Sequence, residues 1–152
     1  MKIEQIASLS PEETKAFGKY LAKFLDKGDI VCLFGELGSG KTTLIKGIAL
    51  GLDIDELKVN SPSFVLMNIY QGRLPLYHFD FYRLEDSKGI GSIGYDEFLY
   101  GDGVSVIEWA DRLGLFLPDG YLKIEVKHKT FDERLISLSA INRDFKYEPF
   151  VH

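Results

Sequence analysis

An eight-residue stretch, Gly35 to Thr42, matches a pattern that binds nucleotide phosphates. It reads G-E-L-G-S-G-K-T and fits G-x-x-x-x-G-K-[ST]. In this pattern the glycines let successive backbone N–H groups turn toward a phosphate, while the lysine reaches the β- and γ-phosphates and the hydroxyl binds Mg²⁺. Lys41 and Thr42 are therefore candidates for binding the phosphates and the metal of a nucleoside triphosphate.

A phosphate loop also needs an acidic side chain for the metal, usually at the end of a neighbouring buried strand. Glu108 closes the apolar run V-S-V-I, and we expect it to bind Mg²⁺ beside Thr42. Asp80 lies in H-F-D-F-Y-R, where it could orient the attacking water or hold the water shell of the metal. The sequence leaves open which of the two acids orients the water.

The elements expected around the loop are those that such a loop requires. The continuous apolar run 30–34 predicts a strand that is buried on both faces. Apolar residues at helical spacing from Lys41 to Leu52 predict a helix directly after the loop. An earlier helix is expected to begin after Ser10, whose side chain would cap it, with Pro11 at its first position.

Further along the chain the pattern becomes extended. Two runs rich in aromatic and β-branched residues, 63–70 and 74–83, are joined by Q-G-R and predict a hairpin. Three more strands and one short helix are expected at 104–108, 122–127, 136–140 and 95–100. The whole chain, 1–152, is predicted to be a single α/β domain of the P-loop NTPase class. Its central mixed β-sheet would be flanked by helices, and its tail after about residue 143 would be peripheral.

The composition is that of an ordinary globular protein, with 45% apolar and 27% charged residues. The net charge of −5 provides no basic field for gripping nucleic acid phosphates, and the short cluster 127–129 is interpreted as a solvated strand end. A lone cysteine, Cys32, allows no intramolecular disulfide and suits a reducing compartment. No apolar run approaches the length of a membrane span, so we expect a cytoplasmic protein that is not in a membrane.

The type of nucleotide can also be argued from motifs. Guanine is normally read by N-K-x-D, and the nearest stretch, 142–144, places its acid one residue too early. The segment D-R-L-G at 111–114 imitates a GTPase switch without that partner motif. The sequence therefore argues against guanine specificity. A small-molecule kinase usually carries an arginine-rich lid, whereas the five arginines here are scattered, so that alternative is weaker but open.

Other residues near these motifs admit two interpretations. Ser61-Pro62-Ser63 could offer hydroxyls to a metal or γ-phosphate, or could simply stiffen the start of the hairpin. A tryptophan in such a position is more often part of the core than a ring that stacks on a ligand, so we interpret Trp109 as a core residue. Lys41 is expected to lie outside the core, so its replacement should weaken phosphate binding without unfolding the domain.

Four segments together resemble the bacterial ATPases of tRNA threonylcarbamoyladenosine biosynthesis, the TsaE (formerly YjeE) family. They are G-E-L-G-S-G-K-T-T, S-P-S-F from Ser61, H-F-D-F-Y-R-L from His78 and V-I-E-W-A-D-R-L from Val106. The likeness runs from the S-P-E-E-T helix start to about Arg134. The loop is shared by many NTPases, whereas the last two segments are far more particular to this family.

The resemblance implies an ATPase with weak activity alone that works with two partners, of the TsaB and TsaD type. Those partners would transfer a threonylcarbamoyl group to N6 of adenosine 37 in tRNA, and this chain would meet tRNA only indirectly. Hydrolysis would reset the assembly, with Asp80, Glu108 and Lys41 as catalytic residues and Thr42 and Glu108 as Mg²⁺ ligands. The residues that would line ATP are Glu36, Gly38, Ser39, Gly40, Lys41, Thr42, Thr43 and Arg134, with 10–14 near the adenine.

Two departures from the family pattern bear on the site. Ser63 stands where the family usually has threonine, which keeps the hydroxyl but loses the methyl group that restricts its rotamer. Ala110 stands where the family has proline after E-W, which removes a constraint on φ shortly after Glu108.

The sequence also leaves open a function of another class. In that alternative the chain is a nucleotide-gated scaffold, and its hydrolysis of the nucleotide is incidental.

Overall fold

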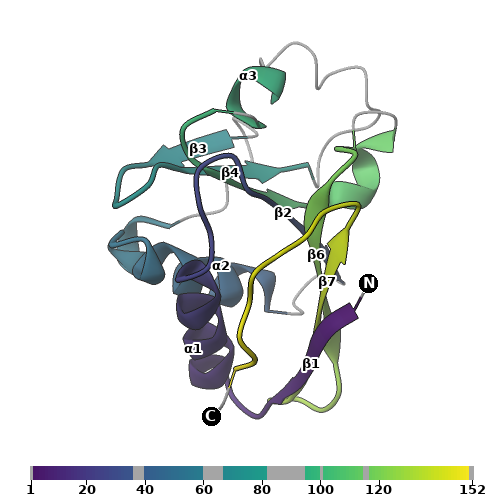
Figure 1. Ribbon diagram of the computed structural model, residues 1–152. Coiled ribbons are helices and arrows are strands. Elements are labelled where there is room, and N and C mark those ends of the chain that lie inside the picture. The colour runs from purple at the N-terminus through teal and green to yellow at the C-terminus, as the bar shows by residue number, and fades with distance from the viewer. Residues whose placement is uncertain are drawn as a thin grey trace.

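The computed structural model describes residues 2–35, 40–59, 67–81, 95–99, 101–114 and 117–150 (Figure 1). Ser61 to Ser63 lie outside these residues. The elements are β1 (Lys2–Ser8), α1 (Pro11–Ala22), β2 (Ile30–Gly35), α2 (Lys41–Gly51), η1 (Glu56–Lys58), β3 (Met67–Tyr70), β4 (Leu76–Asp80), α3 (Tyr95–Leu99), β5 (Val104–Glu108), η3 (Ala110–Arg112), β6 (Tyr121–His128) and β7 (Arg134–Ile141).

The described strands form one seven-stranded sheet in the order β1-β7-β6-β2-β5-β4-β3. Its centre is parallel, because β6, β2, β5 and β4 pair in the same direction, while β3, β7 and β1 add antiparallel edges. The expected mixed sheet and the hairpin of β3 and β4 are confirmed. Parallel strands end at the same edge of a sheet, so the ends of β2, β4, β5 and β6 meet there.

Helices α1 and α2 cover one face of the sheet, and the short α3 lies over the other (Figure 1). The first face buries apolar residues of α2 such as Leu44 and Ile48 against β2 and β5. Two glycines allow α1 and α2 to approach closely. A Cβ at Gly18 would lie 2.5 Å from the carbonyl oxygen of Leu44, and one at Gly47 would collide with the carbonyl of Lys15. This close crossing brings the start of α1 beside the start of α2.

The start of α1 follows the expected capping pattern with one variation. The Ser10 side chain accepts a hydrogen bond from the N–H of Glu13 at 3.2 Å. The Glu13 carboxylate accepts from the N–H of Leu9, one residue before the cap, instead of from the cap itself. The hydroxyls of Ser8 and Thr14 form a buried hydrogen bond of 2.6 Å where the chain passes from β1 to α1. The beginning of α1 is therefore fixed to the sheet.

The strand β1 was not among the predicted elements. Its short K-I-E-Q-I-A-S sequence carries little alternation, and it is a strand because it pairs antiparallel with β7, more than 120 residues later. The tail that was expected to be peripheral also contacts this region. Tyr147 donates its hydroxyl to Glu4, and the N–H of Phe150 donates to the same carboxylate at 2.9 Å. In Figure 1 the yellow tail runs along α1, so it forms an integral part of the described fold.

Among the described residues, no helix combines the length and the apolar character needed to cross a membrane. The thiol of Cys32 is buried in the sheet, as predicted, and burial raises its pKa from the usual 9.0 to about 12. The strand predicted at 122–127 is present as β6, where buried and partly exposed residues alternate, and residues 127–129 are exposed, as expected of a solvated strand end.

Candidate active site

The phosphate-loop pattern connects β2 to α2, which is the context that its function requires. Glu36, Gly38 and Ser39 lie outside the described residues. Gly40 precedes α2 with a φ of +104°, a left-handed conformation that glycine adopts without strain. Lys41 is the first residue of α2, and Thr42 and Thr43 follow in its first turn. The free N–H groups of a helix start favour an anion at this end of α2.

Lys41 is held by two groups of the protein. Its ammonium donates to the carbonyl of Gly35 at 2.9 Å and lies 3.7 Å from the centre of the Trp109 ring. The expectation that this lysine lies outside the core is wrong, because the residue is only 5% exposed. Burial lowers the pKa of Lys41, and the negative charges of Glu108, Asp80 and Asp111 oppose that shift.

The two predicted acids lie side by side at the ends of neighbouring strands. Asp80 on β4 is the register partner of Glu108 on β5, and Glu108 is also the partner of Leu33 on β2. Register partners in parallel strands point to the same face, here the face that α2 covers. Asp80 is 7% exposed and Glu108 is 4% exposed. The sheet therefore places one buried carboxyl group on the strand beside β2, which leads into the phosphate loop, and the other one strand further away.

Glu108 has a buried histidine as its partner. Nε2 of His78 lies 2.6 Å from Oε2 of Glu108, and His78 is fully buried. Nδ1 of the same ring has no hydrogen-bond partner among the described residues. The contact fixes the orientation of the Glu108 carboxylate. Alternation along a strand places His78 on the same face as Asp80, but its bond to Glu108 depends on β4 lying beside β5, which the sequence does not specify.

The residues after Glu108 bring two further side chains to Lys41 that were not predicted. Trp109 adopts φ +59° and ψ +42°, a left-handed conformation that is uncommon for a bulky residue. Its ring is half-buried and faces the ammonium of Lys41, so Trp109 does more than fill the core. Asp111, in η3, adds a negative charge. Its position three residues after Glu108 is the signal that could have identified it.

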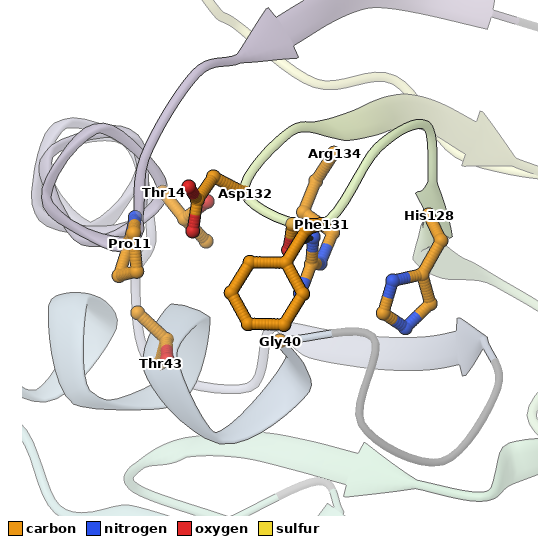
Figure 2. A pocket seen from close by; sticks show the side chains of 8 residues that line it. All are labelled: Pro11, Thr14, Gly40, Thr43, His128, Phe131, Asp132 and Arg134. Atoms are coloured by element: carbon orange, nitrogen blue, oxygen red, sulfur yellow. Dashed lines mark hydrogen bonds between the residues drawn. The ribbon is translucent and has the colours of Figure 1, made fainter.

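A cavity of about 380 Å³ adjoins the start of α2 (Figure 2). Predicted residues from three separate segments meet there: the start of α1, the first turn of α2 and Arg134. The cavity also contains side chains that sequence reasoning missed, on the loop between β6 and β7. The lining residues are Pro11, Thr14, Gly40, Thr43, His128, Phe131, Asp132 and Arg134. Arg134 shapes that loop, because its Nη1 donates to the carbonyls of Thr130, Phe131 and Glu133.

No group of three histidine, cysteine, aspartate or glutamate side chains within the described part of the chain is arranged to hold a metal ion. Mg²⁺ in nucleotide sites is usually bound by one or two protein oxygens together with phosphate oxygens and water. The Thr42 hydroxyl and the Glu108 carboxylate are oxygen donors of this kind. The residues present therefore fit a magnesium–nucleotide complex better than an ion held by protein alone.

The sheet order, the loop that runs into α2 and the acids at the ends of β4 and β5 are those of the P-loop NTPase fold. Within that class the chain belongs to the TsaE family, because residues 8–136 match the family described as threonylcarbamoyl adenosine biosynthesis protein TsaE.

Individual relatives agree with this assignment. The protein named tRNA threonylcarbamoyladenosine biosynthesis protein TsaE from Bacillus subtilis is 43% identical over 147 residues, which cover 96% of this chain and 91% of the relative. Its namesake from Treponema pallidum is 42% identical over 120 residues, covering 79% and 88%. The crystal structure of Bacillus subtilis YdiB superposes with a TM-score of 0.77 at 38% identity, covering 93% of this chain and 88% of that one. The fold and the family expected from the sequence are confirmed.

Proposed function

We propose that this chain binds ATP with Mg²⁺, hydrolyses it, and thereby supports the modification of adenosine 37 in tRNA. In this proposal, partners of the TsaB and TsaD type transfer the threonylcarbamoyl group to N6 of the adenosine, in the cytoplasm. The names of the relatives support the link to this modification. The observation that carries the ATPase proposal is the pair of buried acids, Asp80 and Glu108, at the ends of neighbouring strands, where their charges act on Lys41.

Binding would begin with the phosphates. Lys41 would bind the β- and γ-phosphates, while the N–H groups at the start of α2 receive phosphate oxygens. An ammonium has three N–H donors, so it can keep the Gly35 carbonyl, but a phosphate would compete with the Trp109 ring for the ammonium. This competition would fit the weak activity that we expect of the isolated chain. Arg134 and the residues around the cavity would receive the remainder of the nucleotide.

The chemistry that a bound Mg²⁺ would supply is positive charge, which stabilises the negative charge that develops on the phosphates. Thr42 and Glu108 are the residues that would hold it. The hydrogen bond with His78 would hold one oxygen of Glu108 in place, as partners of metal-binding carboxylates commonly do. Asp80, at the end of the next strand, would orient the attacking water and accept its proton.

The partner proteins would provide the contact with tRNA. A net charge of −5 supports contact with tRNA through other proteins and not through this surface directly. We expect ATP hydrolysis to return the assembly to its starting state between rounds of modification.

The first test is the release of ADP by the purified chain, measured alone, with each partner and with both. The proposal predicts slow release alone and a clear increase with both partners present. ADP release that requires an acceptor metabolite and ignores the partners would instead identify a small-molecule kinase. Modification that needs ATP binding but proceeds with no ADP release would identify a nucleotide-gated scaffold.

A further inference from the structure

We propose that Phe131 provides the ring on which the base of the bound nucleotide stacks. The inference rests on the proposed nucleotide site and adds a base-binding residue to it. Phe131 is 91% exposed, although it is a large apolar side chain. Figure 2 shows its ring reaching from the loop between β6 and β7 toward Gly40 and Thr43 at the start of α2. An exposed aromatic ring at the mouth of a cavity is available for a planar ligand.

The loop that carries Phe131 is held in one conformation by its own hydrogen bonds. The N–H groups of Lys129 and Thr130 donate to the carbonyl of Glu133, and the N–H of Glu133 donates to the Thr130 hydroxyl. From inside the loop, Nη1 of Arg134 donates to three carbonyls, one of them that of Phe131 itself at 2.9 Å. The ring is thus presented by an ordered backbone, which lowers the entropy lost when a ligand binds.

The position of the cavity identifies the part of the ligand that would reach it. The cavity includes Gly40 and Thr43, which flank the phosphate-binding end of α2. A nucleotide whose phosphates lie in the loop would extend its sugar and base from this point. The volume of about 380 Å³ is within the range of small-molecule sites. On the side toward α1, Pro11 adds an apolar wall (Figure 2).

Stacking on an aromatic ring is largely indifferent to which base is stacked. Phe131 should therefore contribute affinity for any nucleoside triphosphate, while other residues distinguish one base from another. It should contribute nothing to a ligand that consists of phosphates alone. These two consequences separate a stacking ring from a residue that only supports the fold of the phosphate loop.

The test is calorimetric titration of the full chain with ATP, GTP and inorganic tripolyphosphate, each with Mg²⁺. Phe131→Ala should weaken ATP about tenfold and GTP, where it binds, by the same factor, with tripolyphosphate unchanged. Phe131→Trp should keep ATP affinity, whereas Phe131→Leu should lose most of it because leucine is apolar but not planar. Leu57→Ala is the matched control, since Leu57 is 83% exposed and lies outside the cavity lining.

The outcomes are distinguishable. If wild type binds ATP and Phe131→Ala binds it equally well, the stacking inference is wrong and the proposed function stands. Equal losses for ATP and tripolyphosphate would also overturn stacking, because they would indicate damage to the phosphate site. If the wild-type chain binds neither ATP nor tripolyphosphate, the proposed function and the inference fail together.

Discussion

The ammonium of Lys41 lies 3.7 Å from the centre of the Trp109 ring, and the same group donates to the carbonyl of Gly35. The lysine expected to bind phosphate is thus already occupied by two groups of the protein. Trp109 follows Glu108 directly and has a left-handed backbone, and its ring faces the ammonium of Lys41. Phosphate binding and the position of Trp109 should therefore be coupled, because a phosphate would compete with the ring for the ammonium of Lys41.

This coupling can be measured by fluorescence, because Trp109 is the sole tryptophan in the sequence. Adding ATP with Mg²⁺ should shift its emission to longer wavelength, as the ring loses the lysine side chain and gains water. Lys41→Met should remove this response at ATP concentrations that saturate the wild type. An unchanged spectrum, in a sample where calorimetry records ATP binding, would show that the contact persists and that the coupling is absent.

Replacement of His78 tests how Glu108 is held. His78→Ala leaves the buried Glu108 oxygen without this partner and opens a cavity, so the free energy of unfolding should fall by about 2–4 kcal/mol. The Mg²⁺ concentration needed for half-maximal ATP hydrolysis should rise about 10–100-fold. Urea unfolding and Mg²⁺ titration measure the two effects. His78→Gln, which keeps an N–H donor, should recover part of both. A loss of stability with unchanged Mg²⁺ dependence would restrict His78 to a structural role.

The chain beyond Arg143 should stabilise the fold through aromatic contacts with α1. The Tyr147 ring lies 5.1 Å from that of Phe24 and 6.0 Å from that of Tyr20, and its hydroxyl donates to Glu4. Tyr147→Phe removes only the hydrogen bond and should cost about 1 kcal/mol, whereas Tyr147→Ala should cost about 2 kcal/mol or more. Denaturant unfolding measures both. Equal stability of all three proteins would mean that the tail contributes nothing to folding.

The sequence predicts elements well wherever local pattern decides them. The buried strand before the loop, the helix from Lys41 and the hairpin that ends at Asp80 follow from apolar periodicity and turn residues. The sequence pattern also indicated that Asp80 and Glu108 lie near the ends of strands. The parallel pairing of β4 and β5 brings these two residues together. The P-loop NTPase fold was predictable for these reasons.

Features that depend on contacts between distant segments were not predictable in this way. The strand β1 is a strand because β7 pairs with it, and the tail is ordered against α1 by aromatic residues with no periodicity of their own. The bond between His78 and Glu108 requires β4 and β5 to be neighbours. Likewise, Phe131 looks like an ordinary loop residue until the loop is seen to fold back toward Gly40.

The stability of the fold should fall as the pH rises above 9, because the thiol of Cys32 is buried. Burial raises the pKa of this thiol from 9.0 to about 12, so between these values the unfolded chain releases a proton that the folded chain keeps. The free energy of unfolding should therefore decrease through this window, by up to about 1.4 kcal/mol per pH unit from this group, and be unaffected by it below pH 9.

Urea unfolding at several pH values from 8 to about 10.5, for wild type and Cys32→Ala, isolates the contribution of the thiol. The variant loses the thiol, so its stability should fall less steeply above pH 9 even if it is lower throughout. Parallel curves for the two proteins would show that the thiol does not resist ionisation in the folded state.

Hydrolysis at Asp80 should support repeated modification of tRNA, and this can be measured in the reconstituted complex. The modified adenosine is counted per complex over time, with both partners and either wild type or Asp80→Asn. Asparagine keeps the size of aspartate but cannot accept the proton, so ADP release should fall at least about 100-fold while ATP affinity is retained. We expect many modifications per complex with wild type and an arrest near one with Asp80→Asn. Continued modification by Asp80→Asn at the wild-type rate, with no ADP released, would contradict it.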